Sequence, residues 1–88
     1  MISENHAKKY DAKKYEEIGN AYIAAECFNN IGTIYLEQED YAQALDCYTK
    51  ALHVLEELED IEGQAMVLNN IGNIYRDQKA WGQSIDYF

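Results

Sequence analysis

The chain has 88 residues, a formal net charge of −9, 48% hydrophobic residues and no proline. This length allows one domain with a modest core, and the acidic balance argues against a nucleic-acid partner, because phosphate binding needs a basic surface. No apolar run approaches the roughly 18 residues of a membrane-spanning helix, so we expect no membrane contact.

Residues 1–20 predict a helix that belongs to a partial upstream repeat or serves as a cap. A shift of forty positions places Tyr15 and Ile18 on Leu55 and Leu58, which are apolar positions of a later helix. The lysines near the start are not followed by an apolar stretch, so a secretory signal is not expected.

Residues 21–62 predict the first full repeat, and its first helix carries a regular apolar stripe. The stripe has the i, i+3, i+4 and i+7 spacing of one helix face. One member is Gly32, although glycine inside a helix costs about 1 kcal/mol relative to alanine. This glycine predicts that a second helix approaches closely, at the small residue Ala44. The stripe consists of Phe28, Ile31, Gly32 and Tyr35.

The second helix of this repeat is expected after a short polar turn at residues 38–40. Asp40 is placed to cap its start. A second apolar stripe follows and extends through the helix: Tyr41, Ala44, Leu45, Tyr48, Ala51, Leu52, Leu55 and Leu58.

Residues 63–88 predict a second repeat, shortened at its end. Residues 29–35 read Asn-Asn-Ile-Gly-Thr-Ile-Tyr, and residues 69–75 repeat this phrase with one change. Ala80 stands where Asp40 stands in the first repeat and cannot cap, so we expect the second turn to be the weaker one.

Repeats that cannot bury their apolar faces alone must stack on one another. The sequence therefore predicts an all-α fold in which antiparallel helix hairpins stack as a right-handed α-solenoid. Residues 1–88 form a single domain in this interpretation.

The positions of the apolar, glycine and aromatic residues resemble the signature of the tetratricopeptide repeat. The period of forty residues exceeds the 34 of the common form, and the proline that closes the common repeat is absent. Both differences resemble the longer repeats of kinesin light chains and of spindle-orienting adaptors. The matching residues are Phe28, Ile31, Gly32, Tyr35, Ala44, Tyr48 and Ala51, followed by Leu68, Ile71, Gly72, Tyr75, Ser84 and Phe88.

In such a stack the first helix of each hairpin lines the concave side, where residues not used in packing are free to bind a peptide. Asparagine is a poor helix former, yet its amide carries the donor and acceptor that a peptide backbone also displays. The predicted peptide-binding residues are Glu26, Asn29, Asn30, Thr33, Glu37, Asn69, Asn70, Asn73, Arg76 and Asp77.

The four paired asparagines have different expected roles. Asn30 and Asn70 match the position of an asparagine ladder in the repeats of O-GlcNAc transferase, and this resemblance implies that they face the ligand. Asn29 and Asn69 either bind the ligand or form hydrogen bonds with the neighbouring repeat.

The charges on this face predict a basic partner. Glu26, Glu37 and Asp77 make the groove acidic, which favours lysine or arginine on the bound peptide, while Arg76 adds one anchoring cation. The family members that bind carboxylate-terminated peptides use lysines and arginines along the same face. This chain lacks those residues.

The two cysteines, Cys27 and Cys47, lie in different predicted helices with no paired spacing. We expect both to be buried as small apolar side chains, with a disulfide or a metal site as the alternative. This usage indicates a reducing compartment and a cytoplasmic location.

No pattern indicates catalysis, a cofactor or a metal site. His6 and His53 lie in separate helices, and no phosphate loop or nucleophile motif occurs. The acidic residues between positions 56 and 62 predict a solvated connection in which Asp60 caps the next helix, because a calcium loop needs another ligand spacing.

The sequence therefore predicts a non-enzymatic interaction module or scaffold that holds an extended, basic segment of another protein along its concave face. The alternative is self-association into a homo-oligomer through open helical ends, since Trp81, Ile85 and Phe88 have little expected cover.

Overall fold

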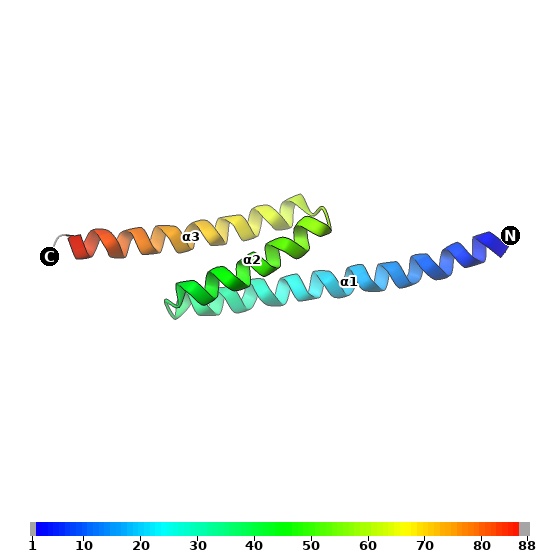
Figure 1. Cartoon of the computed structure of the whole chain (residues 1–88), viewed down its shortest axis with the longest axis horizontal. Helices are drawn as coiled ribbons and strands as arrows, with labels where there is room; N and C mark the ends of the chain where they lie inside the picture. The colour runs from blue at the N-terminus through cyan, green and yellow to red at the C-terminus, as the bar shows by residue number, and fades with distance from the viewer. Residues whose placement is uncertain (1, 87–88) are drawn as a thin grey trace.

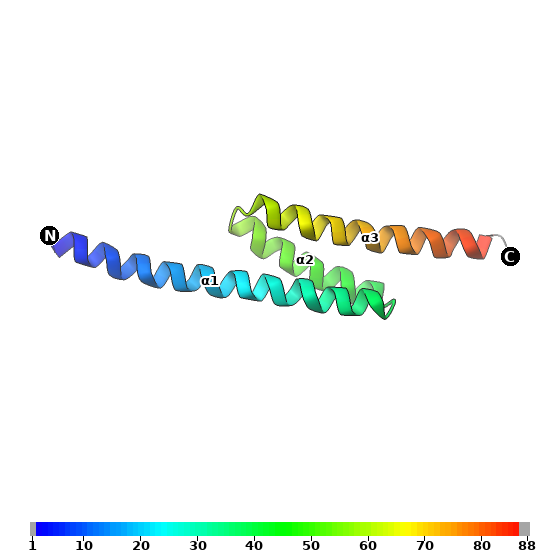
Figure 2. The same ribbon diagram turned by 180° about the vertical axis from the view of Figure 1, so that it is seen from behind.

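The computed structural model describes the backbone of residues 2–86 and the side chains of residues 13–79. Its elements are the helices α1 (Ile2–Glu37), α2 (Tyr41–Glu57) and α3 (Ile61–Asp86). The middle helix α2 lies between the other two and runs antiparallel to both (Figures 1 and 2). The described part of the chain is helical apart from two short turns, which confirms the all-α prediction.

The two turns share one backbone geometry. In the first, the N–H of Asp40 donates to the carbonyl of Tyr35 at 2.9 Å, and the N–H of Glu39 donates to Leu36 at 3.0 Å. The second turn repeats both bonds twenty residues later. Glu39 and Glu59 have φ values of 62° and 57°, the left-handed conformation that ends many helices and that usually falls to glycine.

Both turns are followed by an aspartate cap, as the sequence predicts. A side-chain oxygen of Asp40 accepts from the N–H of Gln43 at 3.3 Å, and the equivalent oxygen of Asp60 accepts from the N–H of Gly63 at 3.0 Å. These bonds satisfy backbone donors that the first turn of a helix leaves without an internal partner.

The expected turn before Trp81 is not formed, because α3 continues as one helix to Asp86. Ala80 offers no side-chain oxygen to cap a new helix, and residues 76–80 contain neither glycine nor proline to end the old one. The weaker turn of the prediction is thus absent altogether. The side chains of Trp81, Ile85 and Phe88 lie outside the described residues.

The first helix is also longer than expected. The structure joins residues 2–20, part of the predicted upstream helix of residues 1–20, to the first helix of residues 21–62, so that α1 has 36 residues. The division of the chain into repeats stays a prediction.

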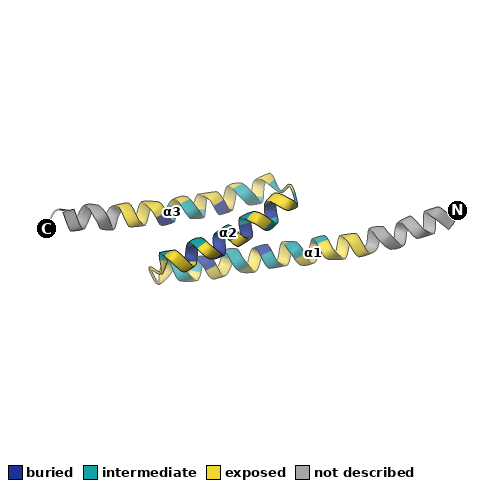
Figure 3. Cartoon of the chain, viewed as in Figure 1, coloured by how far each residue is buried: buried dark blue, intermediate teal, exposed yellow. Residues whose placement is uncertain are grey.

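The core centres on α2 and on the faces of α1 and α3 that meet it (Figure 3). Tyr48 is fully buried, and its ring lies against the backbone of Gly32. The sequence predicts the close approach at Gly32 correctly, but the nearest side chain across the interface belongs to Tyr48 and not to Ala44. The buried cluster contains Ala25, Ala44, Tyr48, Ala51, Leu55, Val67 and Ile74.

The prediction that both cysteines are buried is right for Cys47 and wrong for Cys27, which is exposed. Val67 occupies the position of Cys27 in the second repeat and is only 2% exposed, because α2 covers it. No described helix covers the same face of α1, so Cys27 remains open to solvent.

The two helical glycines provide a matched test of this packing. A Cβ at Gly32 would lie 2.8 Å from ring carbons of Tyr48, whereas a Cβ at Gly72 meets no described atom within 4 Å. We expect Gly32→Ala to destabilise the fold by about 1–3 kcal/mol, since the buried ring has no room to shift. Gly72→Ala should stabilise α3 by up to about 1 kcal/mol through helix propensity.

Thermal unfolding followed by circular dichroism measures both effects, at roughly 4–8 °C per kcal/mol for a domain of this size. Shifts of the same sign in the two variants would contradict the assigned contact between Gly32 and Tyr48.

Candidate peptide-binding groove

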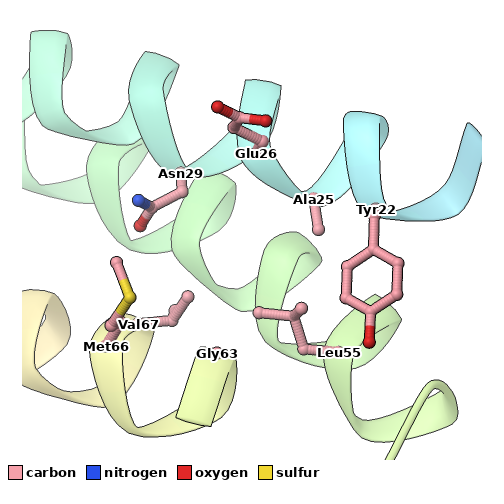
Figure 4. A pocket seen from close by; sticks show the side chains of 8 residues that line it. All are labelled: Tyr22, Ala25, Glu26, Asn29, Leu55, Gly63, Met66 and Val67. Carbon is pink, nitrogen blue, oxygen red and sulfur yellow. The ribbon is translucent and has the colours of Figure 1, made fainter. Parts of the chain in front are cut away.

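A pocket lies between α1 and α3, with α2 behind it. Its volume is about 260 Å³. Figure 4 shows α1 forming one wall and the first turns of α3 the other, with Leu55 of α2 between them. The lining residues are Tyr22, Ala25, Glu26, Asn29, Leu55, Gly63, Met66 and Val67.

The two walls of the pocket come from corresponding parts of the two repeats. Glu26 and Met66 occupy the same position forty residues apart, and each lines the pocket from its own helix. Sequence reasoning included Glu26 among the binding residues but missed Tyr22. The available signal was spacing, since Tyr22 lies one helical turn before Glu26 and therefore on the same side of α1.

A hydrogen bond between two asparagine side chains joins the walls. The amide nitrogen of Asn70 on α3 donates to the amide oxygen of Asn29 on α1 at 2.9 Å, and both residues are half-buried. Asn29 therefore forms a hydrogen bond with the neighbouring repeat, which was one of its two expected roles. Asn70 was expected to face the ligand, but its amide nitrogen has a partner within the protein.

Thr33 likewise has partners inside the protein. Its hydroxyl donates to the carbonyl of Asn29 at 3.1 Å and lies 2.8 Å from the hydroxyl of Tyr48. The half-buried Thr33 therefore satisfies the buried phenol, a group that is costly to leave without a hydrogen bond.

Most of the other predicted site residues lie on the open surface. Asn30 and Asn69, which flank the bonded pair in sequence, are exposed, as are Glu37, Arg76 and Asp77, whereas Asn73 is half-buried. The guanidinium of Arg76 donates to the amide oxygen of Asn73 on the same helix.

The pocket lining contains one carboxylate, that of Glu26. No lysine, arginine or histidine lines the pocket. Lys50 on α2 has its ammonium 3.1 Å from the carboxylate of Asp46 on the same helix and 5.9 Å from the centre of the Phe28 ring on α1. The pKa of the Tyr41 hydroxyl lies above its ordinary value. The larger cause is partial burial, and the carboxylates of Glu39 and Asp77 add to it because they repel the charged phenolate.

The described side chains form no metal site, because no three His, Cys, Asp or Glu side chains among them come together as such a site requires. His53 is exposed, and its ring lies 3.9 Å from the carboxylate of Glu56. None of the described helices has the length and apolar character needed to cross a membrane.

Antiparallel helix hairpins that repeat in sequence, with a groove between the first helices of successive units, define the class of helical repeat proteins. A model of the tetratricopeptide repeat matches residues 24–88. The chain therefore belongs to the tetratricopeptide-repeat family, which confirms the resemblance found in its sequence. No curated protein and no solved structure gave a significant match.

The bond between Asn29 and Asn70 predicts an energetic coupling between the two helices. We expect each single alanine variant to lower the free energy of unfolding by about 0.5–1.5 kcal/mol. The double variant should lose less than the sum of the two, because the same bond is broken in each. Urea unfolding of the four proteins in this cycle measures the coupling.

The neighbouring asparagines are the matched control for this cycle. Asn30→Ala and Asn69→Ala alter exposed side chains, so they should leave stability unchanged or raise it slightly through helix propensity. Strictly additive effects at Asn29 and Asn70 would argue against the bond.

Proposed function

We propose that the chain binds an extended, basic segment of another protein along the groove between α1 and α3. Tetratricopeptide repeats are protein–protein interaction modules, so a protein partner follows from the family. The observation that carries the finer proposal is an apolar pocket with an acidic side chain and an amide in its lining and no cation in its walls.

Exposed amides supply the contacts to a peptide backbone. Asn30 on α1 and Asn69 on α3 are open to solvent, and each amide offers one acceptor and two donor hydrogens. The mutual bond uses the amide oxygen of Asn29 and the amide nitrogen of Asn70. The amide nitrogen of Asn29 and the amide oxygen of Asn70 remain for a ligand. Asn29 and Asn70 fix the groove and contribute to its surface.

The carboxylates provide the preference for basic ligands. Glu26 lies at the pocket, and Glu37 and Asp77 occupy equivalent positions farther along the two helices. Such exposed charges chiefly speed association and set specificity. Arg76, Asn73 and Thr33 complete the proposed surface, with Arg76 placed to bind an acidic group or a carbonyl of the same peptide.

The proposed role is binding without catalysis and without a cofactor. Two cysteines without a disulfide, one of them exposed, fit a reducing cytoplasmic location.

Self-association is the second candidate. It is favoured by apolar side chains that are exposed in one repeat although the equivalent positions of the other repeat are covered. Ile34 on α1 is 53% exposed, although the equivalent Ile74 on α3 is only 1% exposed. Leu68 and Tyr75 on α3 are more than half exposed, while the equivalent residues on α1 pack against the core. Equilibrium sedimentation tests this candidate, because a concentration-independent mass of 10.2 kDa would contradict it.

The proposed peptide binding predicts a charge-specific loss in a peptide-array experiment. The labelled chain is applied to an array of random 12-residue peptides that vary in net charge, and basic peptides should be retained preferentially. A Glu37→Lys plus Asp77→Lys variant should bind the best of them about ten-fold more weakly, since two attractive charges become repulsive.

The control is Glu56→Lys plus Glu57→Lys, which makes the same change in net charge at exposed positions of α2. Equal losses in the two variants would reduce the preference to bulk charge. Retention of no peptide class above background would contradict the proposed function.

A further inference from the structure

The pocket between α1 and α3 is of a size that suits one side chain of a bound polypeptide. Its volume of about 260 Å³ lies below the range of about 300–1,000 Å³ that is usual for pockets enclosing drug-sized molecules. A polypeptide that follows the groove would therefore place a single residue here, while its neighbours remain on the surface.

The interior of the pocket is apolar. Ala25, Leu55 and Val67 belong to the buried core, and the thioether of Met66 extends across from α3 toward α1 (Figure 4). These groups offer contacts to methylene groups but no partner for a charge held at the bottom of the pocket, where an unpaired charge is costly. The occupant must be apolar along the part that enters.

The mouth of the pocket has the opposite character. Tyr22 and Glu26 lie one helical turn apart on α1, and both are exposed. Figure 4 shows the Tyr22 ring extending from α1 toward Leu55 and the carboxylate of Glu26 on the opposite side of α1, so that Glu26 reaches the mouth by rotation of its exposed side chain. An aromatic face and a carboxylate are the two groups that attract a cation. A side chain with an apolar stem and a cationic tip matches this order of apolar interior and acidic mouth.

We propose that this pocket binds an arginine side chain of the partner polypeptide, an assignment that rests on the proposed function. Arginine fits better than lysine because its planar guanidinium can stack on Tyr22, and the exposed side chain of Glu26, one helical turn away, can rotate to form hydrogen bonds with the same group. The amide nitrogen of Asn29, the atom not used in the bond to Asn70, lies in the same wall and can hold the backbone carbonyl of the bound residue.

Single amino-acid derivatives test the pocket without a long peptide. The full chain with ¹³C-methyl methionine is titrated with N-acetyl-arginine amide, and the Met66 methyl signal, assigned with a Met66→Leu variant, reports occupation by NMR. We expect a saturable shift with arginine amide at a lower midpoint concentration than with the lysine amide or the uncharged norleucine amide. N-acetyl-glutamate amide should produce no shift.

Variants of the mouth separate charge from shape. Glu26→Gln should raise the midpoint for arginine amide about two- to five-fold, the range expected for one exposed ion pair, and leave the norleucine midpoint unchanged. Glu17→Gln is the matched control, because it removes the same charge from an exposed position on another side of α1. The control should leave both midpoints unchanged.

Three results would overturn the assignment: a norleucine midpoint as low as that of arginine, a Glu26→Gln variant that binds arginine amide like the wild type, or no saturable shift at Met66. The peptide array distinguishes this failure from failure of the proposed function. Basic peptides retained by the array, with Met66 unmoved by arginine amide, would refute the arginine pocket and leave peptide binding in the groove intact.

Discussion

The contact between the Tyr48 ring and the backbone of Gly32 sets the distance between α1 and α2, and the rest of the fold depends on that distance. A glycine lets the ring lie directly on α1, and the hydroxyl at its far end is satisfied by Thr33 at 2.8 Å. With α2 held this close to α1, its other side receives Val67 and Ile74 of α3 in the same buried cluster. The Tyr48 ring thus influences the position of both walls of the groove, because α3 packs against α2 and α2 packs against α1.

Repeat register explains which parts of this packing could be read from the sequence. The apolar stripes predict helical structure and the Gly32 contact correctly, although not where α1 begins or α3 ends, because a packing face repeats every three to four residues. Burial at each position is different, since it depends on which neighbour is present. Leu68 occupies the position of Phe28, yet Leu68 is 53% exposed whereas Phe28 packs against the core. The same pattern of residues therefore gives covered and open faces within one chain.

The turns show where local chemistry decides the outcome. Asp40 and Asp60 each cap a helix after a left-handed glutamate, and both turns form. Ala80 has no capping group, and the helix continues through it. The two capping aspartates could be predicted from the sequence. The length of α3 could not, because the similarity of the two repeats suggested a turn before Trp81, where Ala80 provides no cap.

The two asparagine pairs show why residue type alone could not identify the binding residues. Asn29 and Asn70 are half-buried and bonded to each other, whereas Asn30 and Asn69 are exposed. The amides are chemically identical, so only the way in which α1 faces α3 decides which of them form a hydrogen bond with each other. This bond matters for the proposed function, because it joins α1 to α3 beside the pocket in the absence of any ligand. A polypeptide bound as proposed would meet a groove that is already formed and would lose less free energy in ordering it, so that a few weak contacts could determine specificity.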